Sequence, residues 1–259
     1  MTPVIDDTIS PRIRLGVTIP VLNNWIGMHM AVNTLTTKHE LRYSIIDNGM
    51  FRLPLATAWN LGVSNLFAKG CDYVLVSNDD VLFSPHTVDA LVARAQRGDV
   101  ALVSAWNVRG LVEKGEEILD FAVPDQINEP PHPDFSCFLI TPECWEKVGM
   151  FDENFIPAYC EDNDYHARIV FSGLHAIQTT AAPYFHFGGV TRNIAVEGEV
   201  PPDVGDLSRA YFQVKWGHQP VSHPDEMWNV YYRNPFNDLR FSLREWPDPK
   251  DVRVGVSGR

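Results

Sequence analysis

One segment constrains the fold of this chain more than any other: the apolar run at residues 73–83, YVLVSNDDVLF. The polar residues SNDD interrupt this run in its middle. Val and Leu without polar alternation are typical of a strand buried on both faces, and open α/β sheets bind ligands at the carboxyl ends of such strands. In an extended segment Asn78 and Asp80 project to the same side, so their oxygens could meet one hard cation such as Mg²⁺ or Mn²⁺. Because Asn, Asp and Ser are also common turn residues, a simple turn is the alternative on this segment alone.

Strand and helix patterns alternate through the first half of the chain. Apolar runs predict strands, and Pro and Gly mark the ends of the helices between them, as at Pro54 and Gly70. This alternation predicts an α/β fold with a mostly parallel central sheet, flanking helices and right-handed crossovers. We expect strands at 15–20, 43–47, 73–83 and 100–106, and helices at 25–36, 53–69 and 85–97.

The second half of the chain contains a second acidic cluster, Glu161-Asp162-Asn163-Asp164. An apolar periodicity follows it and stops at Gly173, so the acids are expected to form the first turn of a helix. Acids in a first turn complement the helix dipole, which is the simplest structural interpretation of this cluster. We also expect a surface excursion at 107–134, strands at 135–140 and 174–179, helices at 142–148 and 207–216, and a loop at 194–206 that could act as a lid.

Composition limits the classes of function. With 259 residues and 45% hydrophobic residues, the chain can bury a large core. A formal net charge of −12 argues against a broad nucleic-acid-binding surface, which needs clustered Lys and Arg. The four cysteines form no CxxC pair, so we expect a reducing compartment. An apolar leader and an apolar run long enough to span a membrane are not seen, and we expect a cytoplasmic protein.

Several short motifs occur in one order, and together they resemble the inverting family-two glycosyltransferases of GT-A fold. In the first half the motifs are TIP at 18–20, IDNG at 46–49, AWNLG at 58–62 and the DxD-type NDD at 78–80. In the second half GMFDENF at 149–155 and EDND at 161–164 resemble the family's G-G-F-D-E-x-F and E-D-x-D pair. The resemblance implies a GT-A domain at 1–206, with a C-terminal helix and extension at 207–259 packed on it.

The resemblance also implies roles for single residues. Asp80, with Asn78 and His186, would bind a divalent cation, Mn²⁺ or Mg²⁺, that neutralises the departing diphosphate of a nucleotide-sugar donor. Asp162 would be the base that deprotonates the acceptor, with Glu161 as the second candidate. The expected nucleotide-binding residues are Thr18, Pro20, Asp47, Asn48, Asn60 and Asp79. Two departures from the family pattern are Asn78, which replaces a carboxylate, and Trp59, which replaces a frequent Arg.

These residues also bear on alternative functions. A lone histidine such as His186, between aromatic residues, is usually a core residue, and the acceptor class is open between protein, glycan and a hydroxylated DNA base flipped into a pocket. A sugar-nucleotidyltransferase would need a Gly- and Lys/Arg-rich loop after the first strand, which residues 21–25, VLNNW, do not provide. A glycoside hydrolase would not explain the nucleotide motifs. A non-catalytic module that binds a nucleotide sugar is the non-enzyme alternative.

Overall fold

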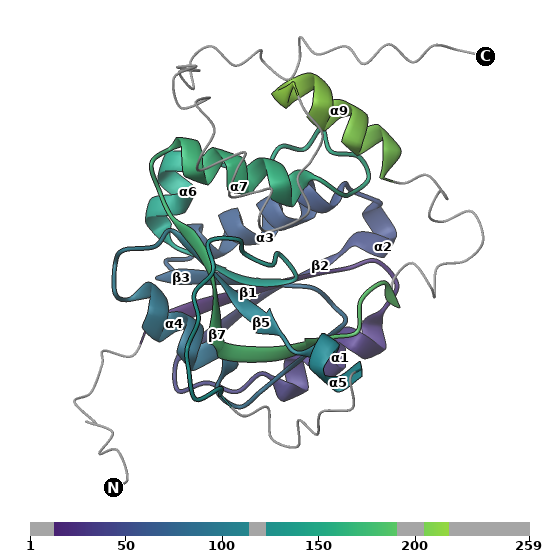
Figure 1. Cartoon of the computed structure of the whole chain (residues 1–259). Helices are drawn as coiled ribbons and strands as arrows, with labels where there is room; N and C mark the ends of the chain where they lie inside the picture. The colour runs from purple at the N-terminus through teal and green to yellow at the C-terminus, as the bar shows by residue number, and fades with distance from the viewer. Residues whose placement is uncertain (1–12, 114–122, 191–204, 218–259) are drawn as a thin grey trace, which may run out of the picture.

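The computed structural model describes residues 13–113, 123–190 and 205–217, which form one mixed sheet with helices on both faces (Figure 1). The strands are β1 (Arg14–Val21), β2 (Glu40–Asp47), β3 (Tyr73–Ser77), β4 (Val81–Phe83), β5 (Leu102–Asn107), β6 (Cys137–Ile140) and β7 (Ala176–His186). The helices are α1 (Trp25–Thr34), α2 (Asn48–Phe51), α3 (Leu55–Ala68), α4 (Thr87–Ala95), α5 (Arg109–Glu113), α6 (Pro142–Val148), α7 (Glu161–Phe171) and α9 (Asp206–Trp216).

The strand order across the sheet is β2-β1-β3-β6-β5-β7-β4. β1 pairs in parallel with β2 and β3, and β5 pairs in parallel with β7. Two of these parallel pairs, β1–β2 and β5–β7, have the longest registers, and the sheet confirms the expected mostly parallel α/β fold. The short strand β6, however, lies antiparallel between β3 and β5, and β4 pairs antiparallel with β7.

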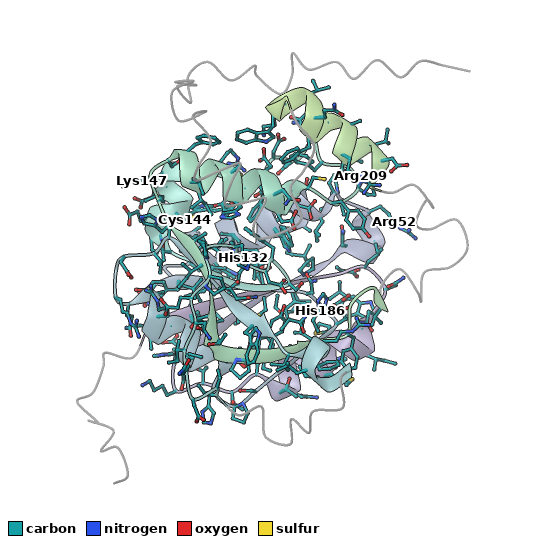
Figure 2. The ribbon with its side chains drawn as sticks, in the orientation of Figure 1. Arg52, His132, Cys144, Lys147, His186 and Arg209 are labelled. Carbon is teal, nitrogen blue, oxygen red and sulfur yellow. The ribbon has the colours of Figure 1, made fainter. Side chains whose placement is uncertain are left out.

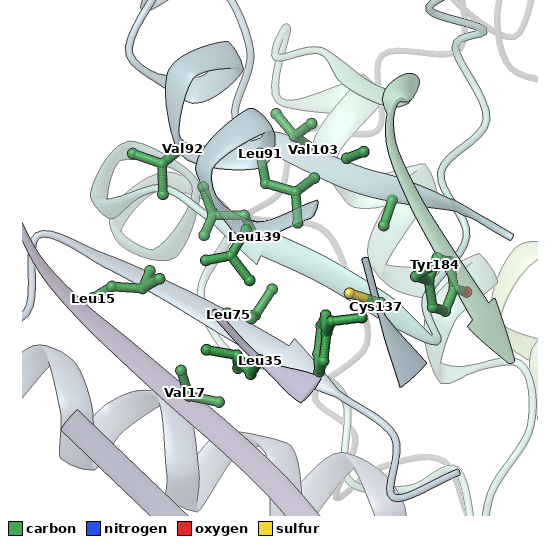
Figure 3. Packing of buried hydrophobic residues seen from close by; sticks show 14 of the residues in the cluster. Leu15, Val17, Leu35, Leu75, Leu91, Val92, Val103, Cys137, Leu139 and Tyr184 are labelled. Atoms are coloured by element: carbon green, nitrogen blue, oxygen red, sulfur yellow. The ribbon is translucent and has the colours of Figure 1, made fainter. Parts of the chain in front are cut away.

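The central strand β3 is buried on both faces, as its sequence predicts. Leu75 belongs to a core cluster with side chains from α1 and α4 (Figure 3), whereas Val74 and Val76 belong to a cluster with side chains from α3, α6 and α7. Successive side chains of a strand point to opposite faces, so one short apolar segment supports both helical layers. The carboxyl end of β3 is thereby held firmly in the middle of the sheet.

Several expected elements differ from the structure in extent. The strand expected at 73–83 is divided into β3 and β4 by residues 78–80. The strand expected at 174–179 continues through β7 to His186, because its second half pairs with β4 at the sheet edge. The helix expected from Pro85 begins at Thr87 instead. Its start is a turn in which the Ser84 N–H donates to Thr87 Oγ1 (2.9 Å), and the His86 N–H donates to Ser84 Oγ (3.2 Å).

The described part of the C-terminal region is α9, which packs on the same domain. Tyr211, Phe212 and Trp216 contact Phe155 and Cys160 in a small apolar cluster. The loop expected at 194–206 lies almost wholly outside the described residues, as does the segment 218–259. All four cysteines are buried and carry free thiols. Among the helices that are described, none has the length and apolar character that a bilayer crossing requires.

Candidate active site

The acidic end of β3 is a tight connection between β3 and β4. The Asn78 N–H donates to the Ser136 carbonyl (2.9 Å), and the Asn24 amide donates to the Asp79 carbonyl (3.1 Å). Asn24 also caps α1 by accepting from the Gly27 N–H. The backbone that carries the acids is therefore tied to two neighbouring segments, and both Asp79 and Asp80 are 5% exposed.

The structure brings His186 to Asp80 from a distant part of the chain. Because β4 pairs with β7 so that Val81 lies opposite His186, the imidazole reaches the residue just before β4. His186 Nε2 lies 3.0 Å from Asp80 Oδ1 and 3.5 Å from the Asn78 amide nitrogen. All three residues expected to bind a cation are thus in contact; Figure 2 labels His186 beside the sheet.

These donor atoms fit a small divalent cation. Two adjacent ligands of an octahedral ion with bonds of about 2.1 Å are roughly 3.0 Å apart, which matches the separation of His186 Nε2 and Asp80 Oδ1. Rotation of the Asn78 amide would turn its oxygen toward the same point. The described residues contain no cluster of three or more His, Cys, Asp or Glu side chains arranged for a metal. A hard cation here would therefore take its remaining ligands from substrate phosphates and water, as Mg²⁺ commonly does.

The second acidic cluster forms the first turn of α7, as its sequence predicts. Two residues with positive φ, Tyr159 (78°) and Cys160 (67°), lead the chain into this helix. Such conformations cost about 1–3 kcal/mol each for residues other than Gly and persist only where the surroundings impose them. Here the Ser208 hydroxyl of α9 donates to the Ala158 carbonyl (2.8 Å), which helps to hold the strained entry.

The two candidate bases lie in a poorly solvated setting. Burial raises the pKa of Glu161 well above its ordinary value, and the charge of Asp162 acts in the same direction. Burial also raises the pKa of Asp162; the nearby Asp134 adds to the increase, while a hydrogen bond from the Asn163 N–H opposes it. At Asp162 burial thus opposes the preference of a helix N-terminus for an ionised carboxylate.

The buried Glu161 makes stability depend on pH. One of its oxygens has no hydrogen-bond partner, and its pKa is higher in the folded state than the ordinary value of 4.5. Between these two values the folded state binds more protons, so the free energy of unfolding falls as pH rises. We expect Glu161→Gln to raise the free energy of unfolding at pH 8 and to change it much less at pH 5, because the neutral amide removes the burial of a carboxylate charge.

This prediction is checked by urea unfolding of both proteins at pH 5 and pH 8. Glu146→Gln, at an exposed position of α6, is the matched control and should change stability little at either pH. If Glu161→Gln destabilises the protein equally at both pH values, Glu161 is ionised and paired in the folded state, and the description above is wrong.

The last acid of the cluster, Asp164, has a structural role. It is fully buried and accepts from the Trp216 indole (3.0 Å) and from Arg168 Nε (2.9 Å), and it lies 2.6 Å from Lys215 Nζ. Lys215 Nζ also donates to Asp152 Oδ2 (2.6 Å). Burial alone would raise the pKa of Asp152, but the Lys215 ammonium and hydrogen bonds lower it below its ordinary value. Asp164 therefore binds α9 to α7, and Asp152 binds α9 to the segment before α7.

An acidic residue outside the expected motifs connects the two halves of the site. Asp134 accepts from the Tyr184 hydroxyl (3.0 Å), and Tyr184 lies two positions before His186 on β7. Asp134 is also close enough to Asp162 to raise the pKa of that residue. The acids of α7 and the end of β7 thus face a common region of the molecule.

Three of the residues expected to bind the nucleotide, Thr18, Pro20 and Asp47, lie on β1 and β2 and differ in their exposure. Asp47 is exposed at the end of β2, where Oδ1 accepts from the Met50 N–H (3.3 Å). Pro20 and Thr18 are both buried on β1. The Thr18 hydroxyl donates to the Ser44 carbonyl (2.9 Å), and a Cβ added at Gly62 would lie 1.9 Å from Thr18 Oγ1. Gly62 thus allows α3 to pack directly on Thr18.

Asn48 and Asn60, both expected to bind the nucleotide, hydrogen-bond to the protein backbone. Asn48 closes the loop after β2, since its amide donates to the Leu53 carbonyl (2.9 Å) and accepts from the Leu53 N–H (2.8 Å). Asn60 makes the same double contact with Phe151 (2.9 and 2.8 Å), and also donates to Glu153 Oε1 (2.9 Å). Asn60 therefore joins α3 to the segment before α7. Its motif signals a structural link between the two halves of the domain.

Comparisons with known proteins bear on the fold. No protein-family model and no curated protein sequence matches the chain. The mannosyltransferase PcManGT from Pyrobaculum calidifontis, solved with GDP-Man and Mn²⁺, is similar with a TM-score of 0.50 and 13% identity, over 80% of this chain and 71% of that one. GalNAc-T7, solved with UDP, GalNAc and Mn²⁺, is similar with a TM-score of 0.51 and 11% identity, over 68% of this chain. The match covers 44% of GalNAc-T7. At these identities the likeness is one of fold, and the fold of this chain is that of the GT-A glycosyltransferases.

Proposed function

We propose that this protein is a metal-dependent, inverting glycosyltransferase that moves a sugar from a nucleotide-diphosphate sugar to an acceptor hydroxyl. The observation that carries the proposal is the contact of Asp80 with His186 (3.0 Å) at the carboxyl end of β3, in a GT-A fold. Two solved proteins with this fold hold Mn²⁺ together with a nucleotide or nucleotide sugar. A protein or glycan acceptor suits the net charge of −12 better than nucleic acid does.

The donor would lie along the carboxyl ends of β1, β2 and β3. Asp80, His186 and Asn78 would hold the cation, which when bound neutralises the charge that develops on the departing diphosphate. The exposed carboxylate of Asp47 would accept from the nucleobase, and Asp79 would contact the ribose or the sugar. Free, buried thiols suit a reducing compartment such as the cytoplasm.

Asp162 would act as the base. A carboxylate opposite the leaving group takes the proton of the acceptor hydroxyl while its oxygen attacks the anomeric carbon, and this single displacement inverts the configuration. The raised pKa of Asp162, caused first by burial, makes it a stronger base than an exposed aspartate once it is deprotonated. Glu161, buried beside it, is more strongly held in the protonated form.

Calorimetric titration tests the donor and the metal together. UDP-, GDP-, dTDP- and CMP-sugars are titrated into the protein with and without Mn²⁺, and we expect one nucleotide class to bind only with the cation. Asp80→Ala should weaken this metal-dependent binding at least 10-fold, because it removes the carboxylate ligand. Asp72→Ala, an aspartate at the opposite end of β3 that contacts Arg14, is the matched control. Metal-dependent binding that survives in Asp80→Ala would show that the cation lies elsewhere.

A further inference from the structure

The segment that carries His186 is bonded to the protein on both of its edges. Successive N–H groups of a strand point to opposite neighbours, and here the Phe187 N–H donates to the Asp80 carbonyl (3.0 Å). The His186 N–H points the other way and donates to the side-chain oxygen of Asn107 (3.3 Å). On the first edge the partner is backbone, whereas on the second it is one side chain.

The Asn107 side chain replaces a backbone acceptor where the pairing of β5 with β7 becomes irregular. The register between these strands shifts between Ala105 and Trp106, and Trp106 then lies opposite Pro183, which has no N–H to donate. The last residue of β5, Asn107, lies opposite Tyr184. Its side chain extends past the end of the ladder and supplies the acceptor that the next N–H of β7 requires.

The same asparagine oxygen organises the chain that follows β5. It accepts from the Arg109 N–H (3.0 Å), at the start of α5. The Arg109 guanidinium in turn donates to the Phe187 carbonyl. Gly188 makes room for this contact, since it has a φ of +69° and a Cβ there would lie 2.5 Å from Arg109 Nη1. The Asn107 oxygen thus binds the His186 N–H directly, and it binds the N–H of Arg109, whose guanidinium holds the Phe187 carbonyl.

We infer that Asn107 is a positioning residue that sets the His186 imidazole against Asp80 for cation binding. This inference rests on the proposed function, because it assumes that the Asp80–His186 pair binds the metal. The imidazole reaches Asp80 only while the end of β7 stays fixed. On the side away from β4 the last backbone bond runs from the Val108 N–H to the Tyr184 carbonyl (2.9 Å), and beyond it the Asn107 oxygen holds the His186 N–H itself. Groups that orient a metal ligand typically contribute 10- to 100-fold to metal affinity.

The test compares Asn107→Ala with Asn107→Asp in the full-length protein. Binding of Mn²⁺ alone is followed by the electron paramagnetic resonance signal of the free ion, and exchange of the His186 amide is followed in the metal-free protein. We expect Asn107→Ala to weaken Mn²⁺ binding 10- to 100-fold and to speed exchange of that amide. Asn107→Asp keeps an acceptor oxygen for both N–H groups, so it should retain the affinity of the natural protein and the protection of the amide.

Gln178→Ala is the matched control, because Gln178 is another side-chain amide between the same two strands. It donates to the Ala105 carbonyl (3.1 Å) on the other side of the register shift from His186. This variant should leave Mn²⁺ affinity unchanged. Equal Mn²⁺ affinity in Asn107→Ala and the natural protein would overturn the inference, even if the amide exchanges faster.

Other outcomes separate the inference from the proposed function. If Asn107→Ala does not fold, Asn107→Asp decides, and a folded Asn107→Asp that loses amide protection but keeps the Mn²⁺ affinity of the natural protein would overturn the inference. If the natural protein binds no Mn²⁺, the metal-dependent function fails first and the inference fails with it. If the natural protein binds Mn²⁺ and only the Asn107 variants behave otherwise than expected, the proposed function stands alone.

Discussion

Replacing Asp162 by Asn should lower the rate of sugar transfer by about 10²- to 10⁴-fold, the range that a general base contributes. The amide has nearly the same size and can still accept from the Asn163 N–H, as Asp162 Oδ1 does at 2.8 Å. It cannot take up the proton of the acceptor. Donor and Mn²⁺ affinities should therefore stay near those of the natural protein while kcat falls, which steady-state kinetics and calorimetry measure separately.

The dependence of the rate on pH provides a second check on Asp162. Burial raises the pKa of this carboxyl above its ordinary value of 3.8, so the base is protonated up to a higher pH than an exposed aspartate. As pH is lowered, activity should therefore begin to fall at a higher pH than it would with an exposed aspartate as the base. Asp125→Asn, at an exposed position, is the matched control. If Asp162→Asn keeps its activity and Glu161→Gln loses it, Glu161 is the base and our assignment is wrong.

Replacing Asp164 by Ala should lower the free energy of unfolding by about 3–5 kcal/mol, the usual cost of removing one partner from a buried ion pair. Asp164 is fully buried and in contact with Arg168 (2.9 Å) and Lys215 (2.6 Å). Without it Lys215 still contacts Asp152, but the buried Arg168 guanidinium loses its carboxylate. A domain of this size should melt roughly 6 to 20 °C lower, which calorimetry measures.

Asp206→Ala is the matched control for this experiment. Asp206 is an acid in the first turn of α9 that pairs with Arg209, but both side chains are largely exposed. Exposed pairs contribute about 0–1 kcal/mol, so this variant should be nearly neutral. If Asp164→Ala costs no more than Asp206→Ala, the buried charges at the junction of α7 and α9 do not hold these helices together.

Local patterns predicted much of the fold. The buried character of β3, the start of α6 at Pro142 and the acidic first turn of α7 follow from residues that are close in sequence. The antiparallel placement of β6 and the extension of β7 to His186 were not predicted. Both depend on pairing between strands far apart in the chain, which the periodicity of a single segment does not reveal.

In the candidate site, too, some features were predicted from the sequence and others depend on contacts between distant residues. The side chains of Asn78, Asp80 and His186 were expected to meet, and they do, because the family order of motifs carries long-range information. Asn107 was missed, since an asparagine at a strand end is unremarkable until the pairing with β7 is known. Lys215 was missed because its partner Asp152 is 63 positions away. Asn60 was expected at the nucleotide, but its hydrogen bonds to Phe151 and Glu153 give its motif a structural explanation.

Release of nucleoside diphosphate from nucleotide sugars is the measurement that tests the central claim most directly. Each of the four nucleotide-sugar classes is incubated with the protein and Mn²⁺, and both the nucleotide and the anomeric configuration of the freed or transferred sugar are followed by NMR. We predict that one donor class is consumed only with the cation, that the product is inverted, and that Asp80→Ala and Asp162→Asn abolish most of the turnover. If no nucleotide sugar is bound or consumed with any divalent cation, the chain has the fold of a glycosyltransferase without its activity.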